Sequence, residues 1–120
     1  MDGKVAGREE RIHMEVIVDA YGPKEQAMGW YYYLDDKINF PFVAECISAD
    51  KRTPLAVGEK ITVTQMSGEG YCEHEMYVDI SWDGKTLAVP LVQLKAVDAD
   101  DDTIEAVEDW LYWKRKGYTF

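Results

Sequence analysis

The sequence predicts one α+β domain: N-terminal helices, a small bent antiparallel sheet or SH3-like barrel, and a C-terminal helix. Three observations lead to this class. Residues 23–34 are apolar around much of a helical circumference, residues 42–89 alternate in short stretches between turn residues, and residues 102–117 carry signals for both helix ends. The chain of 120 residues has the length of a single domain, residues 1–120.

The N-terminal region has the weakest pattern. Residues 1–7 contain two glycines and no apolar period, so we expect a flexible tail there. In residues 8–21, the alternating Ile12, Met14, Val16 and Val18 would suit a strand. The spacing of Ile12, Val16, Ile17 and Ala20 would suit a helix face, and helix is favoured because two glutamates fit its first turn.

The helix predicted over residues 23–34 opens with Gly22-Pro23, and proline is favoured at a first helical position. Apolar side chains cover so much of its surface that it should lie between other elements. These side chains are Ala27, Met28, Trp30, Tyr31, Tyr33 and Leu34. Pro41 prevents helix at Phe40, so the chain should continue as β structure from there.

Four short strands are predicted, at residues 42–48, 59–66, 74–82 and 85–89. In the third, Met76, Val78, Ile80 and Trp82 alternate with polar residues and should face the core. Asp83-Gly84 is a strong hairpin signal between the last two strands. Pro90 then restricts the last strand to a sheet edge, since it cannot donate to a ladder.

The C-terminal helix has a capping box, with Asp102 as the expected N-cap and Glu105 three residues later. Gly117 supplies the expected stop. The preceding acidic run, residues 98–102, has aspartates at the first, third and fifth positions of an EF-hand loop. Thr103 stands where that loop needs glycine, so an EF-hand is rejected.

The adjacent Asp35 and Asp36 are expected at the C-terminal end of the helix over residues 23–34. That end already carries a partial negative charge and unpaired carbonyls, so the two carboxylates are repelled by it. A hard cation such as Ca²⁺ would remove the conflict, because it takes carboxylate and carbonyl oxygens together. A solvated acidic turn is the alternative interpretation.

Several segments, in their order and spacing, resemble one family. They are Asp19-Ala-Tyr-Gly-Pro, Glu25-Gln-Ala-Met-Gly-Trp-Tyr-Tyr-Tyr-Leu-Asp-Asp-Lys-Ile, Phe40-Pro-Phe, Pro54-Leu-Ala-Val-Gly-Glu, Cys72-Glu-His-Glu-Met, Leu87-Ala-Val-Pro-Leu-Val-Gln-Leu, Ala106-Val-Glu-Asp-Trp-Leu-Tyr-Trp and Gly117-Tyr. Together they cover roughly residues 15–118 and resemble the cyanobacterial calcium-binding protein (CcbP-type) family. The resemblance implies a calcium buffer or sequestering store without an EF-hand. The implied ligands of Ca²⁺ are Asp36, Asp35, Asn39, Glu73 and Glu75.

Other functional classes have little support in the sequence. A net charge of −10 disfavours nucleic acid and anionic membranes as partners, and no apolar stretch is long enough to span a membrane. No nucleophile motif stands out among three serines and two histidines, so we do not expect an enzyme. Two isolated cysteines without an export signal predict a cytoplasmic protein. The alternative function is a protein-interaction module that uses Trp30 and Tyr77 to hold a basic or proline-rich partner.

Overall fold

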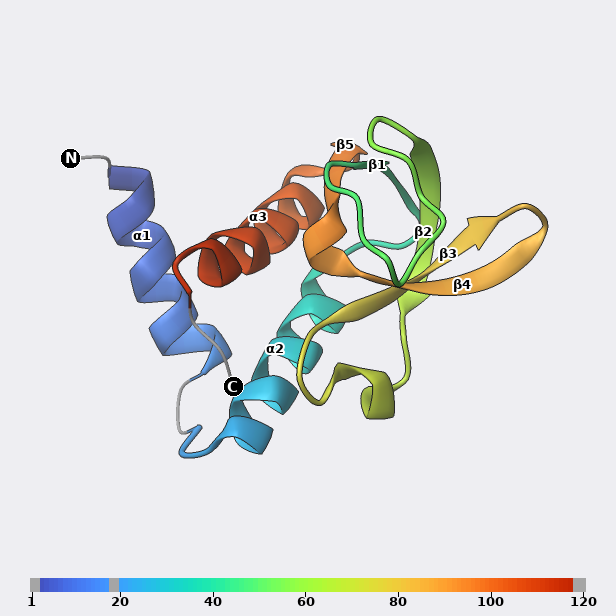
Figure 1. Cartoon of the computed structure of the whole chain (residues 1–120). Coiled ribbons are helices and arrows are strands. Elements are labelled where there is room, and N and C mark those ends of the chain that lie inside the picture. Colours follow the sequence, from blue (N-terminus) through green and yellow to red (C-terminus); the bar gives the residue numbers. More distant parts are fainter. Residues whose placement is uncertain (1–2, 18–19, 118–120) are drawn as a thin grey trace.

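The structure, a computed structural model, describes residues 3–17 and 20–117 and confirms the α+β class. The described residues form three α-helices and a five-stranded sheet. The helices lie together beside the sheet, and the β3–β4 hairpin extends away from them (Figure 1). The elements, in order, are α1 (Gly3–Arg11), η1 (Ile12–Val16), α2 (Pro23–Lys37), β1 (Phe42–Cys46), β2 (Lys60–Met66), η2 (Glu69–Cys72), β3 (Tyr77–Trp82), β4 (Lys85–Pro90), η3 (Leu91–Gln93), β5 (Leu94–Asp98) and α3 (Asp101–Arg115).

The N-terminal region is helical from Gly3 to Val16, ending in the π-helical turn η1. The helix favoured for residues 8–21 is therefore confirmed up to Val16, whereas residues 18–19 lie outside the described residues. Residues 3–7, which were expected to belong to a flexible tail, form the start of helix α1, and residues 1–2 are not described. The reason is tertiary: Arg8 and Arg11 both donate to Asp109 of α3, so helix α1 is held by contacts that its own sequence does not contain.

Helix α2 runs three residues beyond the predicted end, to Lys37, and so includes Asp35 and Asp36 in its last turn. The face of α2 that carries Gly29 lies against η1. A Cβ added to this glycine would be 2.3 Å from the carbonyl oxygen of Val16. On the other side, Trp30 is fully buried against Trp110 and Trp113 of α3, with ring centroids 5.0 and 5.4 Å away. Helix α2 is thus enclosed on several sides, as its apolar circumference predicts.

The five strands form one antiparallel sheet in the order β4-β3-β2-β1-β5. No ladder joins β4 to β5 in the described part of the chain, so the sheet is open, as in the first of the two predicted forms. Asp83 and Gly84 both have positive φ, 50° and 74°, which is the primed turn that their sequence predicts. Strand β4 lies at an edge and ends at Pro90, as expected, but β5 was not predicted.

Helix α3 begins two residues earlier than predicted, with Asp100 rather than Asp102 as the N-cap residue. Thr103 donates to the Asp100 carboxylate, and this contact fixes the start of the helix. Glu105 does not complete a capping box but binds Lys37 and Arg11. Gly117 has φ of 86° just beyond the helix, as a C-terminal stop requires. The buried side of α3 includes Val107, Trp110, Leu111 and Trp113.

Candidate functional site

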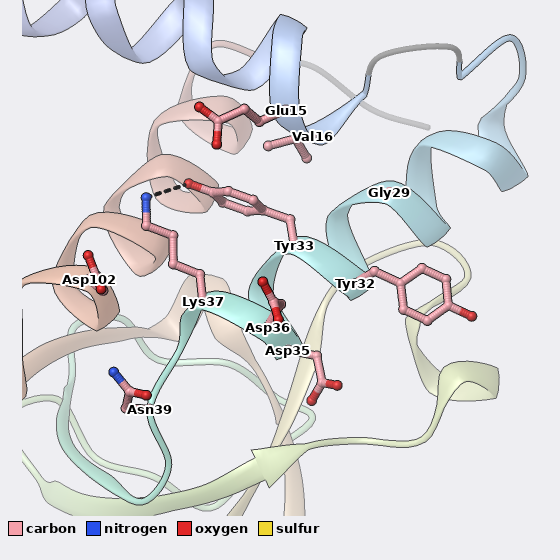
Figure 2. A pocket seen from close by; sticks show the side chains of 10 residues that line it. All are labelled: Glu15, Val16, Gly29, Tyr32, Tyr33, Asp35, Asp36, Lys37, Asn39 and Asp102. Atoms are coloured by element: carbon pink, nitrogen blue, oxygen red, sulfur yellow. Dashed lines mark hydrogen bonds between the residues drawn. The ribbon is translucent and has the colours of Figure 1, made fainter.

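An open cleft of about 1010 Å³ lies where the end of α2, the turn η1 and the start of α3 come together. Figure 2 shows its lining from these three elements and the loop after α2. The lining residues are Glu15, Val16, Gly29, Tyr32, Tyr33, Asp35, Asp36, Lys37, Asn39 and Asp102. Three of the five predicted calcium ligands, Asp35, Asp36 and Asn39, are therefore brought to one cleft.

Four carboxylates line this cleft: Glu15, Asp35, Asp36 and Asp102. All four residues are exposed, and no described residue forms a hydrogen bond or an ion pair with their side chains. Asp35 and Asp36 occupy the last turn of α2, where the helix dipole is negative and adds to the repulsion between them. Burial, followed by the negative charge of Asp35, raises the pKa of Tyr31 on the preceding turn. The cleft is thus a region of uncompensated negative potential.

Lys37 is the one basic residue among the described residues that line the cleft, and its ammonium binds groups other than the four cleft carboxylates. Its ammonium donates to the Tyr33 hydroxyl at 3.0 Å and to the carboxylate of Glu105. Burial lowers the pKa of Lys37, but the bonds to Glu105 and Tyr33 outweigh this effect and the net direction is upward. The lysine therefore remains charged and is held against α3.

Tyr33 connects the cleft wall to a buried ion cluster. Its hydroxyl donates to Asp109 at 2.7 Å, and the same carboxylate, fully buried, accepts from Arg8 and Arg11. Burial and the bond to Asp109 raise the pKa of Tyr33 to about 12. The cluster fixes α1, α2 and α3 relative to one another, and it thereby positions the three walls of the cleft.

Asn39 lines the cleft from the loop after α2, beside the start of α3. Its backbone N–H donates to Thr103 Oγ1 at 2.8 Å, and its side-chain amide donates to Asp100 at 2.7 Å. The hydrogen bond from Thr103, followed by that from Asn39, lowers the pKa of Asp100. These bonds hold the loop after α2 against α3, and they leave the amide oxygen of Asn39 without a hydrogen bond from any described residue.

The other two predicted ligands lie outside this cleft. Glu75 forms an ion pair with Arg52 at 2.9 Å, and Glu73 lines a separate groove of about 150 Å³ beside the first turns of α2. Conversely, sequence reasoning missed Glu15 and Asp102 as cleft residues. Asp102 was interpreted as a helix cap, and Glu15 lies in the segment whose pattern was ambiguous. No sequence signal placed either residue beside Asp36.

The donor chemistry of the cleft fits a hard cation, although its carboxylates do not converge. Its carboxylate and amide groups present oxygen ligands, which Ca²⁺ prefers, and none of the described residues that line it carries sulfur or an imidazole. Within the described residues, no three His, Cys, Asp or Glu side chains are grouped closely enough to hold a metal ion. Figure 2 shows the carboxylates of Asp35 and Asp36 pointing in different directions. Side-chain rotation at an exposed helix end would have to bring them together.

Comparison with known proteins decides the family. A family model for calcium-binding CcbP proteins matches residues 10–114. The chain belongs to the CcbP family of calcium-binding proteins. The crystal structure of Anabaena CcbP is 41% identical to it, with a TM-score of 0.85, and the match covers 96% of this chain and 94% of that one. A calcium-binding protein in the calcium-binding form is 42% identical, with a TM-score of 0.80, covering 95% and 94% of the two chains.

Curated proteins give no sequence match. Among the described residues of this CcbP family member, no helix has both the length and the apolar character needed to cross a membrane. The family resemblance expected from the sequence is therefore confirmed over nearly the whole chain, together with the α+β fold that it implies.

Proposed function

We propose that this CcbP family member binds Ca²⁺ in the cleft between α2 and α3 and acts as a cytoplasmic calcium buffer or sequestering store. The observation that carries the proposal is a charge imbalance. Four carboxylates without partners among the described residues line the cleft, and its one lining cation is bound elsewhere. A divalent cation bound there would neutralise both the carboxylates and the negative end of α2.

Asp36 and Asp35 are the proposed principal ligands, with Asn39 supplying a neutral oxygen. Asp102 and Glu15 lie on the facing walls and complete the oxygen set. Glu73 and Glu75 are not included, because they lie in a separate groove and in an ion pair with Arg52. Such a site differs from an EF-hand, whose ligands come from one continuous loop.

A buffering role suits the openness and the chemistry of the cleft. Its proposed ligands are exposed, so the ion can enter and leave without a large rearrangement, and its described lining contains no serine, cysteine or histidine. Cys46 and Cys72 are both buried and unpaired, which is typical of a reducing compartment.

One of the two aromatic side chains on which the alternative function, a protein-interaction module, depends is not accessible. Trp30 is fully buried, so it is not available to a partner. Tyr77 is partly buried, and its hydroxyl accepts a hydrogen bond from Arg52 at 2.7 Å. No observation among the described residues favours a basic or proline-rich partner over a calcium ion.

Calorimetric titration of the purified protein tests the calcium proposal. We expect heat from Ca²⁺ and little from Mg²⁺, because Mg²⁺ requires a tight octahedral site that flexible, exposed carboxylates do not supply. Asp36→Asn should weaken Ca²⁺ binding at least tenfold, equivalent to about 1.4 kcal/mol. Asp83→Asn is the matched control, since it removes the same charge from an exposed turn outside the cleft.

Metal-free melting separates a ligand from a turn residue. Removing a carboxylate that is repelled by the helix end should leave the metal-free Asp36→Asn protein equally or slightly more stable. If that variant melts lower without metal and still shows the normal thermal shift with Ca²⁺, the site has been placed wrongly. Equal responses to Ca²⁺ and Mg²⁺, or no response, would reject the function itself.

A further inference from the structure

We propose that Glu105 is a positioning residue for the calcium site. It holds the Lys37 ammonium against α3, and it thereby prevents this lysine from neutralising the carboxylates that take the ion. This inference rests on the proposed calcium function, but it concerns a residue that does not line the cleft and would not touch the metal.

The contacts of Lys37 show how it is held. It follows Asp36 directly in the sequence and lines the same cleft. Its ammonium donates to Glu105 and to the Tyr33 hydroxyl, and it lies 5.3 Å from the centre of the Tyr33 ring. The lysine side chain is only 18% exposed. Three contacts therefore fix an otherwise flexible cation in one position.

Among these contacts, Glu105 supplies the one opposite charge. It extends from α3 across to α2, and its second oxygen lies 3.5 Å from Arg11 of α1. Tyr33 offers Lys37 only a neutral hydroxyl, which in turn donates to Asp109. Among the described residues, Glu105 is the one carboxylate that forms an ion pair with the Lys37 ammonium.

The four carboxylates of the cleft share its lining with Lys37 and have no partner among the described residues, so they are available to a released lysine. A lysine carries a compact charge on a long flexible stem, so it can turn toward Asp36 or across to Asp102. An ammonium in the cleft would repel Ca²⁺ and occupy its ligands. Glu105 would therefore increase calcium affinity by binding the competing cation, although it contributes no ligand.

A double-mutant cycle tests this mechanism by calorimetric Ca²⁺ titration at fixed ionic strength. Glu105→Gln should weaken Ca²⁺ binding about tenfold, a free-energy change of about 1.4 kcal/mol. Lys37→Met should bind Ca²⁺ as tightly as the wild type or more tightly. The double variant should match Lys37→Met, because Glu105 has no further effect once the lysine is absent.

Glu108→Gln is the matched control for charge. Glu108 is on the same helix, pairs with Arg8, and has no contact with Lys37 among the described residues. We expect its removal to change the affinity less than twofold. Metal-free melting curves of all four variants, recorded without any calcium, should show that each remains folded and that Glu105→Gln is less stable than wild type, since Lys37 and Arg11 lose their partner.

The outcomes distinguish the inference from the function on which it rests. If Glu105→Gln weakens binding equally with and without Lys37, Glu105 acts only through its general charge and the positioning role is refuted. An equal loss in Glu108→Gln refutes it in the same way. If the wild-type protein shows no calcium heat, the proposed function fails and the inference is rejected with it.

Discussion

Gly29→Ala is the change whose effect the packing defines most sharply. At this position α2 lies directly against the π-helical turn η1. A Cβ would be 2.3 Å from the carbonyl oxygen of Val16, 3.4 Å from its carbonyl carbon and 3.9 Å from the Cα of Ile17. All three are backbone atoms, so no side-chain rotation can relieve the contact. The added methyl group must push η1 away from α2.

Two effects of opposite sign determine the magnitude. Alanine is favoured over glycine inside a helix by about 1 kcal/mol. Forcing an extra carbon into a filled interface costs about 1–3 kcal/mol, and here the clash is with main chain, which favours the upper part of that range. The net loss of stability should therefore be about 1–2 kcal/mol. For a domain of this size it corresponds to a melting temperature lower by about 3–10 °C.

Thermal unfolding followed by circular dichroism measures this loss, and Gly7→Ala is the control. Gly7 lies inside helix α1, and a Cβ there would meet nothing within 4 Å, so only the propensity gain remains. The control should melt at or above the wild-type temperature. If Gly29→Ala also melts at or above it, α2 and η1 are not packed this closely and the reasoning is refuted.

Three further outcomes follow from the ion cluster and the start of α3. Asp109→Asn should cost about 3 kcal/mol in denaturant unfolding, because Arg8 and Arg11 would lose a fully buried carboxylate; a loss under 1 kcal/mol would contradict the buried pairing. Tyr33 has a pKa raised from 10.0 to about 12, so its contribution to stability is complete below pH 10 and is lost as the pH rises to 12. Across that window the wild type should lose about 1–2 kcal/mol more than Tyr33→Phe, after allowance for solvent screening, and parallel pH profiles would contradict this. Asp100→Ala should lower the melting temperature clearly, whereas Asp102→Ala should change it little, because Thr103 and Asn39 bind only the former carboxylate; the reverse order would restore Asp102 as the cap.

Local signals explain which parts of the fold could be predicted from the sequence. Helix α2, strand β2 and the hairpin at Asp83-Gly84 carry their own periodicity and turn residues, so no distant contact was needed to predict them. Strand β5 has a short, weak alternation directly after the turn η3, and its pairing with β1 supplies what its sequence lacks. Helix α1 depends on Asp109, about a hundred residues away, which no local pattern reveals.

The residues of the candidate site likewise fall into those that a local pattern predicts and those that only tertiary packing brings together. Asp35, Asp36 and Asn39 are neighbours in the sequence, so a pattern at one helix end was enough to group them. Glu15 and Asp102 reach the same cleft only because η1 and α3 pack beside α2. Asp100 rather than Asp102 is the N-cap because its carboxylate accepts from Thr103, a local contact, and from Asn39, a tertiary one. Similarly, Arg52 binds Glu75 on another surface, which no spacing could indicate.

The buried tryptophans provide an intrinsic fluorescent probe in this protein. Trp30, Trp110 and Trp113 have ring centroids within 5.0–5.6 Å of one another, whereas Trp82 lies apart on the hairpin and donates to Glu59. Tyr33 meets Trp30 edge-on at 5.9 Å, and its hydroxyl accepts from Lys37 on the cleft wall. The tryptophan cluster is therefore one contact, through Tyr33, from the cleft beside the end of α2. The tryptophan fluorescence of this cluster should therefore respond to ion binding at the end of α2 without an attached dye. Trp82→Phe would remove the tryptophan emission that comes from the hairpin.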